Sequence, residues 1–152
     1  MNAATHRAER NGEFELSTDP ARLDRALIHE FLSKHSYWAT GVPRAVVDRA
    51  IEHSLCFGVY RGAAQVAFAR VITDRATFAY LADVFVVADA RRDGVGKWMI
   101  GCVMRHPDLQ GLRRFLLFTK DAHSFYARFG FVPLLNSARA LERFAPDVYA
   151  GG

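Results

Sequence analysis

Apolar positions in the first third of the chain recur with helical spacing. Pro20 follows the polar run Ser17–Asp19, and a capping side chain followed by proline is typical of a helix start. Apolar side chains then fall on one helix face, at Leu23, Ala26, Leu27, Phe31 and Leu32. This spacing predicts an amphipathic helix that ends near Lys34. Pro43 opens a second predicted helix, whose buried side carries Val46, Val47, Ala50 and Ile51.

The middle of the chain changes to runs of strand-forming residues. Residues 55–60 and 65–72 flank the turn pair Arg61-Gly62, so they predict a hairpin. Residues 77–87 form a longer strand that is apolar at nearly every position, as expected of a central strand covered on both faces. A short strand at residues 14–16 precedes them.

The last third predicts a helix at 94–105, a strand at 113–118, a short helix at 121–129 and a final strand at 131–135. The strands before and after the helix at 94–105 should pair in parallel through a right-handed crossover. Hairpins connect the other strands, so the sheet is mixed. We therefore expect an α+β fold in three layers, with a mixed central sheet and helices on both faces. It forms a single domain over residues 13–152, preceded by a loose polar segment, 1–12.

Composition narrows the class of protein. The chain has 152 residues, 51% of them hydrophobic and 24% charged, which is ordinary for one globular domain. Cys56 and Cys102 lie in apolar runs and are expected to be buried thiols. No Cys/His cluster has zinc spacing, so we expect no metal. The chain has no signal-like apolar core and no run of membrane-spanning length, so we expect a cytoplasmic protein without membrane contact.

The net charge of +4 raises the question of nucleic acid. A nucleic-acid binder usually gathers its basic residues into a run or stripe. Here only the pairs Arg91-Arg92 and Arg113-Arg114 cluster. We therefore expect the basic residues to serve solubility and an anionic small ligand rather than DNA or RNA.

The segment 84–100 is predicted to run from strand through turn to helix, with Gly94 and Gly96 at the turn. The first turn of a helix has unpaired N–H groups and a partial positive charge, which together bind phosphate oxygens. A Walker loop would need glycine at Arg91 and Ser or Thr at Trp98, and a dinucleotide fingerprint would need glycine at Met99. Neither motif fits.

The spacing of Arg91, Gly94 and Gly96 does fit the pattern Arg/Gln-x-x-Gly-x-Gly/Ala, which resembles the pyrophosphate-binding signature of the GNAT acetyltransferase superfamily. The downstream series is also similar to a GNAT segment, at Thr119, Ala122, Phe125, Tyr126, Gly130 and Phe131. The resemblance covers residues 13–135. It departs from the family at Thr119, where Asn is frequent, and at Arg92, where glycine is common.

The resemblance implies an enzyme that transfers an acetyl group from acetyl-CoA to a primary amine by direct attack in a ternary complex. The implied cofactor-binding residues are Phe85, Val86, Val87, Arg91, Arg92, Asp93, Gly94, Val95, Gly96, Lys97, Thr119, Ala122 and Tyr126. Backbone amides around Phe85–Val87 would face the oxyanion.

Two residues are candidates for catalysis. Similarity to the family places Tyr126 beside the thioester sulfur, where its phenol can protonate the leaving thiolate, although it could instead be one more packed aromatic beside Phe125 and Phe129. Asp83 is the lone charge in an apolar strand. It could bind the acceptor amine or act as a base, or it could form an ion pair with an arginine such as Arg70.

Three further residues are candidates for the acceptor site. Tyr37 and Trp38 lie in the loop between the first helices, where the family usually shapes this pocket, although both could instead cover the core. His123 precedes Tyr126 by one helical turn and could relay a proton or be a surface residue. The acceptor itself, a small molecule or peptide amine, stays open, as does a homodimer. The rival function is a GNAT-fold module that binds acyl-CoA without catalysis.

Overall fold

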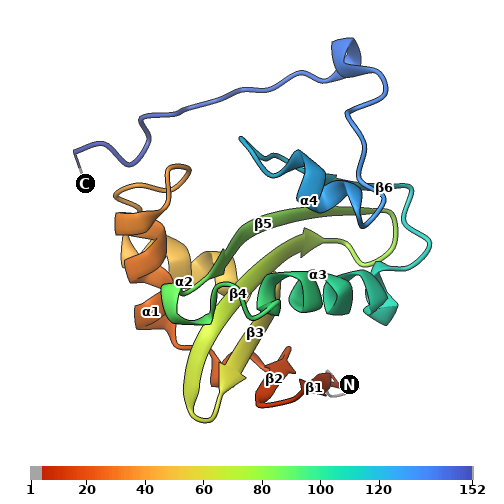
Figure 1. The fold of residues 1–152 in the computed structure, drawn as a ribbon. Coiled ribbons are helices and arrows are strands. Elements are labelled where there is room, and N and C mark those ends of the chain that lie inside the picture. Colours follow the sequence, from red (N-terminus) through yellow and green to blue (C-terminus); the bar gives the residue numbers. More distant parts are fainter. Residues whose placement is uncertain (1–4, 152) are drawn as a thin grey trace.

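The computed structural model describes residues 5–151. Within them a single mixed sheet has the strand order β1-β2-β3-β4-β5-β6, antiparallel throughout except that β5 and β6 run parallel (Figure 1). The strands are β1 (Ala8–Asn11), β2 (Phe14–Ser17), β3 (Leu55–Arg61), β4 (Ala64–Thr73), β5 (Phe78–Val86) and β6 (Arg114–Leu117). The parallel pair is joined by the predicted helical crossover.

Helices cover both faces of this sheet, which confirms the α+β three-layer prediction (Figure 1). They are α1 (Arg25–Glu30), continued by a π-helical turn (Phe31–His35), α2 (Arg44–Glu52), α3 (Val95–Arg105) and the short α4 (His123–Ala127). The buried side chains of α3, among them Met99, Ile100 and Val103, join one core cluster. Those of α1 and α2 join a second cluster, which includes Phe68 and Phe85 from the sheet.

The structure differs from the sequence prediction at the N-terminal end. Residues 8–11, placed in a loose segment, form β1 and pair with β2, so the segment is not loose there; residues 1–4 lie outside the described part. Pro20 begins only a 3₁₀ turn, with the Asp19 side chain accepting a hydrogen bond from the Ala21 amide. The α-helix starts later, where the Asp24 side chain accepts from the Leu27 amide. Two consecutive caps thus divide one predicted helix.

The predicted last strand at residues 131–135 is wrong. Gly130 adopts a left-handed φ of 90° and turns the chain away from β6. Pro133 has no N–H to donate to a ladder. Residues 131–151 instead form an extended C-terminal segment that runs from α4 back across the molecule toward α1 and α2 (Figure 1). Near its end, Tyr149 packs against the α1–α2 core cluster.

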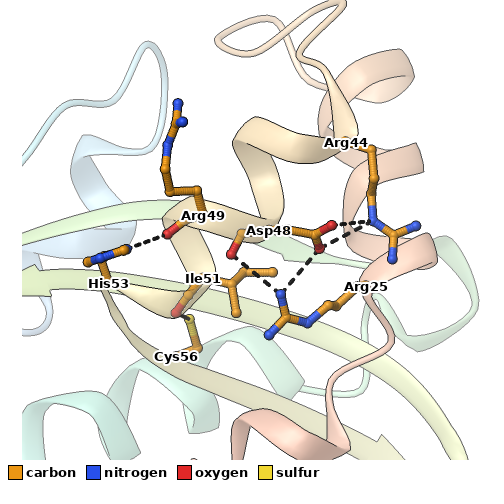
Figure 2. A network of polar contacts seen from close by, with 7 residues as sticks. All are labelled: Arg25, Arg44, Asp48, Arg49, Ile51, His53 and Cys56. Carbon is orange, nitrogen blue, oxygen red and sulfur yellow. Dashed lines mark hydrogen bonds and ion pairs between the residues drawn. The ribbon is translucent and has the colours of Figure 1, made fainter.

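A carboxylate on α2 ties the two helices of this layer together (Figure 2). Asp48 accepts a hydrogen bond from Nη1 of Arg25 on α1 at 3.2 Å and forms an ion pair with Nε of Arg44 at 3.2 Å. At the end of α2, a ring nitrogen of His53 lies 2.9 Å from the Arg49 carbonyl. The Arg25–Asp48 contact therefore joins the start of α1 to the middle of α2.

Candidate active site

The parallel strands β5 and β6 separate partway along their length. Their pairing covers only Phe78–Leu81 against Arg114–Leu117, whereas β5 continues to Val86. Within the described residues, no strand pairs with this side of β5 beyond Leu81. The free edge presents backbone N–H and C=O groups to a gap, as a strand does when it receives an extended ligand.

A β-bulge at Asp83 reverses the alternation of side chains along β5, so that residues before and after it contribute to different faces of the sheet. Asp83 has a left-handed φ of 54°, and the register with β4 shifts between Phe68 and Arg70. Before the bulge, Leu81 belongs to the α3-side cluster; after it, Phe85 belongs to the α1–α2 cluster and stacks on Phe31 at 4.1 Å between ring centroids. A positive φ in a non-glycine residue is strained and is typical of functional sites.

The Asp83 carboxylate has partners on both oxygens. Nε of Arg70 donates to Oδ2 at 2.7 Å, and Nε1 of Trp38 donates to Oδ1 at 2.8 Å. Both members of the ion pair are largely buried, with side-chain exposures of 15% for Arg70 and 11% for Asp83. The arginine alternative weighed from the sequence is therefore present, together with an indole contact that the sequence did not suggest.

The N-terminus of α3 is open. Gly94 precedes the helix with a left-handed φ of 74°, and no side chain of the described residues caps the first turn. Arg92 also has a positive φ, and both Arg92 and Lys97 are exposed beside this turn. Nε of Arg91 donates to the Val86 carbonyl at 3.0 Å, which joins the turn to the end of β5. The turn thus combines free amides, cations and a glycine conformation, as a phosphate site requires.

Other residues of the predicted cofactor set have different surroundings. The side chain of Val95 is buried in the α3-side core, so only its backbone can face a ligand. Asp93 lies 4.0 Å from an Arg61 nitrogen. A Cβ on Gly96 would meet a Val86 methyl at 3.5 Å, an ordinary contact, so the protein itself has room for an alanine side chain there.

Of the amides expected to face an oxyanion, one is already engaged. The Val87 N–H donates to the Val66 carbonyl at 2.8 Å, toward β4. Because successive N–H groups point to opposite sides of a strand, the Val86 amide points away from β4, into the gap. Phe85 is buried and contributes core packing. Val86 is therefore the amide best placed for this role.

Tyr126 lies on α4 and is half-buried, with its ring against Phe125 and Phe131. Burial raises the pKa of this phenol above its usual value, with a smaller contribution from Tyr37.

Thr119, which stands where Asn is frequent in the family, lies just before α4. Its Oγ1 accepts a hydrogen bond from the Ala122 amide at 3.0 Å, so the hydroxyl already has a partner within the same segment. His123 is exposed at the start of α4.

A cavity of about 890 Å³ lies between α1, α2, the loop that joins them, the middle of β5, the residues after β6 and the C-terminal segment. Tyr37 and Trp38 line it and pack edge to face, with 5.1 Å between ring centroids. Sequence reasoning missed the other aromatic side chains of the lining, namely Phe68, Tyr80, Phe118, Phe144 and Tyr149. Phe144 and Tyr149 come from the C-terminal segment, where no motif or periodicity marks them.

Neither cysteine takes part in this cavity. Cys56 and Cys102 are buried, free and absent from its lining. Burial raises the pKa of each thiol to about 12, so both stay protonated at neutral pH.

Residues 5–151 contain no group of three or more His, Cys, Asp or Glu side chains able to hold a metal ion. No helix in the same range is both long and apolar enough to cross a bilayer.

The site thus combines a three-layer fold, a strand edge that is free beyond Leu81 and an open turn into α3, and comparison with known proteins identifies the class of protein. Residues 52–133 match the family model of the acetyltransferase (GNAT) domain. A proposed acetyltransferase of Gibberella zeae is 32% identical over 139 residues, covering 77% of each chain. A proposed GNAT-family acetyltransferase from Xanthomonas campestris pv. campestris is 54% identical, with a TM-score of 0.89 over 90% of this chain and 96% of that one.

The chain therefore belongs to the GNAT acetyltransferase family. A more distant solved structure, a proposed acetyltransferase from Deinococcus radiodurans, is 18% identical with a TM-score of 0.66 over 91% of this chain and 92% of that one, and supports the fold alone. Both the family resemblance and the fold predicted from the sequence are confirmed.

Proposed function

We propose that this protein transfers the acetyl group of acetyl-CoA to a primary amine. The observation that carries the proposal is the continuity of the free β5 edge with the open N-terminus of α3, linked by the contact between Arg91 and Val86. An extended pantetheine arm fits a free strand edge, and a pyrophosphate fits the turn at its end.

The residues divide the work by their chemistry. Arg91, Arg92, Lys97 and the amides after Gly94 would hold the phosphates, with Thr119 and Ala122 along the arm. The Val86 amide would stabilise the oxyanion as the amine attacks. Acetyl-CoA supplies an activated acyl group: an N–C bond forms, the C–S bond breaks, one proton leaves nitrogen and one reaches sulfur. Tyr126 would deliver the proton to sulfur.

Direct transfer in a ternary complex is favoured over an acyl-cysteine route. A cysteine nucleophile must reach the thioester as a thiolate. Cys56 and Cys102 are both buried away from the cavity, and burial raises the pKa of each to about 12. The amine therefore attacks the thioester itself.

Two measurements test this function. Calorimetry should show acetyl-CoA binding, and a thiol-release assay with a panel of primary amines should show turnover that depends on the amine. Binding without turnover for any amine would favour the rival function, an acyl-CoA-binding module. Absence of binding would overturn both.

A further inference from the structure

The cavity beside the β5–β6 gap has an unusual distribution of charge. Its charged lining residues are Arg70, Asp83, Asp121 and Glu142. Arg70 and Asp83 neutralise each other at 2.7 Å in the largely buried part. Asp121 and Glu142 belong to the exposed part of the lining, and no ion pair engages either carboxylate within residues 5–151. The largely buried part of the cavity has no free carboxylate for a second or third ammonium group.

Apart from Thr40 and Thr119, the rest of the lining is apolar or aromatic. Tyr80 and Phe118 pack together at 5.8 Å on one side, and Tyr37 and Trp38 form an edge-to-face pair on another. Phe144 of the C-terminal segment completes the wall. Surfaces of this kind bind apolar and aromatic bodies by burial, and they attract a single cation through their ring faces.

A chain of hydrogen bonds through Asp83 to Arg70 holds the Trp38 side chain in position. Asp83 accepts the indole N–H of Trp38 and is itself held by Arg70, so the loop after α1 is tethered to the bulge in β5. Pairing with Arg70 also compensates the Asp83 charge. Because this ion pair is neutral overall, the buried part of the cavity does not stabilise the ammonium form of an acceptor. The acceptor has to lose that proton before it attacks.

We infer that the acceptor is a primary amine with a single positive charge on an aromatic or branched aliphatic body, bound between the 36–43 loop, α2 and the C-terminal segment. Its nitrogen reaches the β5–β6 gap while its body fills the aromatic cavity. Polyamines and aminoglycosides should bind less well, because an additional ammonium in the largely buried part of the cavity has no free carboxylate partner and only the exposed Asp121 and Glu142 remain. This inference rests on the proposed function and goes further by specifying the acceptor.

The test compares amines of matched reactivity on the full-length protein. We expect kcat/KM for 2-phenylethylamine to exceed that for propylamine by roughly tenfold or more, because only the former carries a body that the cavity can bury. Spermidine and kanamycin should be no better than propylamine. A clear preference for spermidine or kanamycin, or equal rates for 2-phenylethylamine and propylamine, would overturn the inference while leaving acetyl transfer intact.

A variant pair links the preference to the cavity. Phe144→Ala should lower kcat/KM for 2-phenylethylamine several-fold more than kcat/KM for propylamine, with acetyl-CoA affinity unchanged. Leu141→Ala is the matched control, since Leu141 lies on the same segment, is 96% exposed and does not line the cavity. An equal effect of the two substitutions would contradict the assignment.

Failure of the proposed function can be told apart from failure of this inference. If no amine is acetylated, tryptophan fluorescence still reports binding, because Trp38 lines the cavity. Tighter binding of 2-phenylethylamine than of propylamine in the presence of CoA would support the cavity assignment without catalysis. Equal binding of the two amines would reject it.

Discussion

At the scale of single residues, one phenol and one carboxylate were singled out in the sequence, and the structure gives them different surroundings. Tyr126 is half-buried beside aromatic rings, and burial raises its pKa. Asp83 is held by Arg70 and Trp38. The first arrangement keeps a proton available for transfer. The second arrangement commits the carboxylate to positioning other groups, so we propose that Asp83 acts through Trp38 rather than on the acceptor directly.

Tyr126→Phe removes one oxygen and keeps the ring, so packing against Phe125 and Phe131 should survive. General acid help is worth about 10² to 10⁴ in rate, and we expect kcat to fall by about two orders of magnitude with acetyl-CoA affinity little changed. Steady-state kinetics and calorimetry measure the two quantities. A variant that keeps near-normal kcat would assign the proton to water or to another residue such as His123.

The pH dependence follows from the raised pKa of Tyr126. The phenol is the acid in its protonated form, and its pKa lies above the ordinary value of about 10. The wild-type rate should therefore rise with pH as the acceptor amine loses its proton, and should not fall again between about pH 7 and 9.5. A rate maximum inside that range would show that a group of lower pKa supplies the proton.

Asp83→Asn tests the tether. We expect a lower melting temperature, because Arg70 is left largely buried without its counter-charge, and a raised acceptor KM with unchanged acetyl-CoA affinity. Trp38→Phe is the sharper variant, since it removes the indole N–H and leaves the ion pair. It should raise acceptor KM with little change in melting temperature. Normal acceptor kinetics in both variants would remove the tether from the function.

At the scale of elements, the turn into α3 is the feature that local sequence determines most directly. Gly94 has a φ of 74°, a conformation that glycine adopts at no steric cost. Gly96 has an ordinary φ, and a Cβ there would lie next to a Val86 methyl. The two glycines therefore have different roles. Gly94 allows the conformation of the turn, and Gly96 keeps a larger side chain away from a ligand at the helix start.

Gly94→Val should weaken acetyl-CoA binding by well over tenfold, measured by calorimetry. The substitution also strains the backbone, so Gly62→Val serves as the matched control: Gly62 has a φ of 61° in the β3–β4 turn, with open space around it. The control should lose comparable stability and keep its affinity. Gly96→Ala, which the signature allows and whose Cβ meets only an ordinary contact, should fold normally and keep its affinity, whereas Gly96→Val should bind more weakly. Unchanged affinity in folded Gly94→Val and Gly96→Val proteins would contradict the phosphate assignment.

At the scale of the whole molecule, the C-terminal segment leaves much apolar surface uncovered. Among the described residues after Gly130, the large apolar side chains that are exposed are Val132, Leu134, Leu135, Leu141, Phe144 and Val148. β6 is also an edge strand with no partner on its outer side within residues 5–151. Exposed apolar patches and open strand edges favour association.

The expected homodimer thus stays a prediction with a physical basis. Light scattering coupled to size exclusion should show a mass that rises from monomer toward dimer between micromolar and millimolar concentrations. The double substitution Leu135→Ser and Leu141→Ser should shift the transition to higher concentration, since it removes exposed apolar surface. A monomeric mass throughout the range would contradict the homodimer prediction, and the C-terminal segment would then serve only to line the cavity.

The sequence by itself determined the family, the three-layer fold, the turn at Arg91–Gly96 and the short helix that carries Tyr126. These features depend on short stretches in which glycine conformation, a free helix start and apolar spacing act locally. The sequence did not determine the conformation of the C-terminal segment. Residues 131–135 include strand-forming residues, but the left-handed φ of Gly130 directs them away from β6. Whether such a segment pairs depends on the neighbouring strand, which local pattern does not encode.

Only the tertiary structure decided the cavity and the role of Asp83. Trp38 and Asp83 are 45 positions apart in sequence, and they meet because a bulge in β5 and the packing of α1 against the sheet bring them together. Phe144 and Tyr149 reach the same cavity from the far end of the chain. Such contacts depend on which layers pack against which, and no spacing along the sequence carries that information.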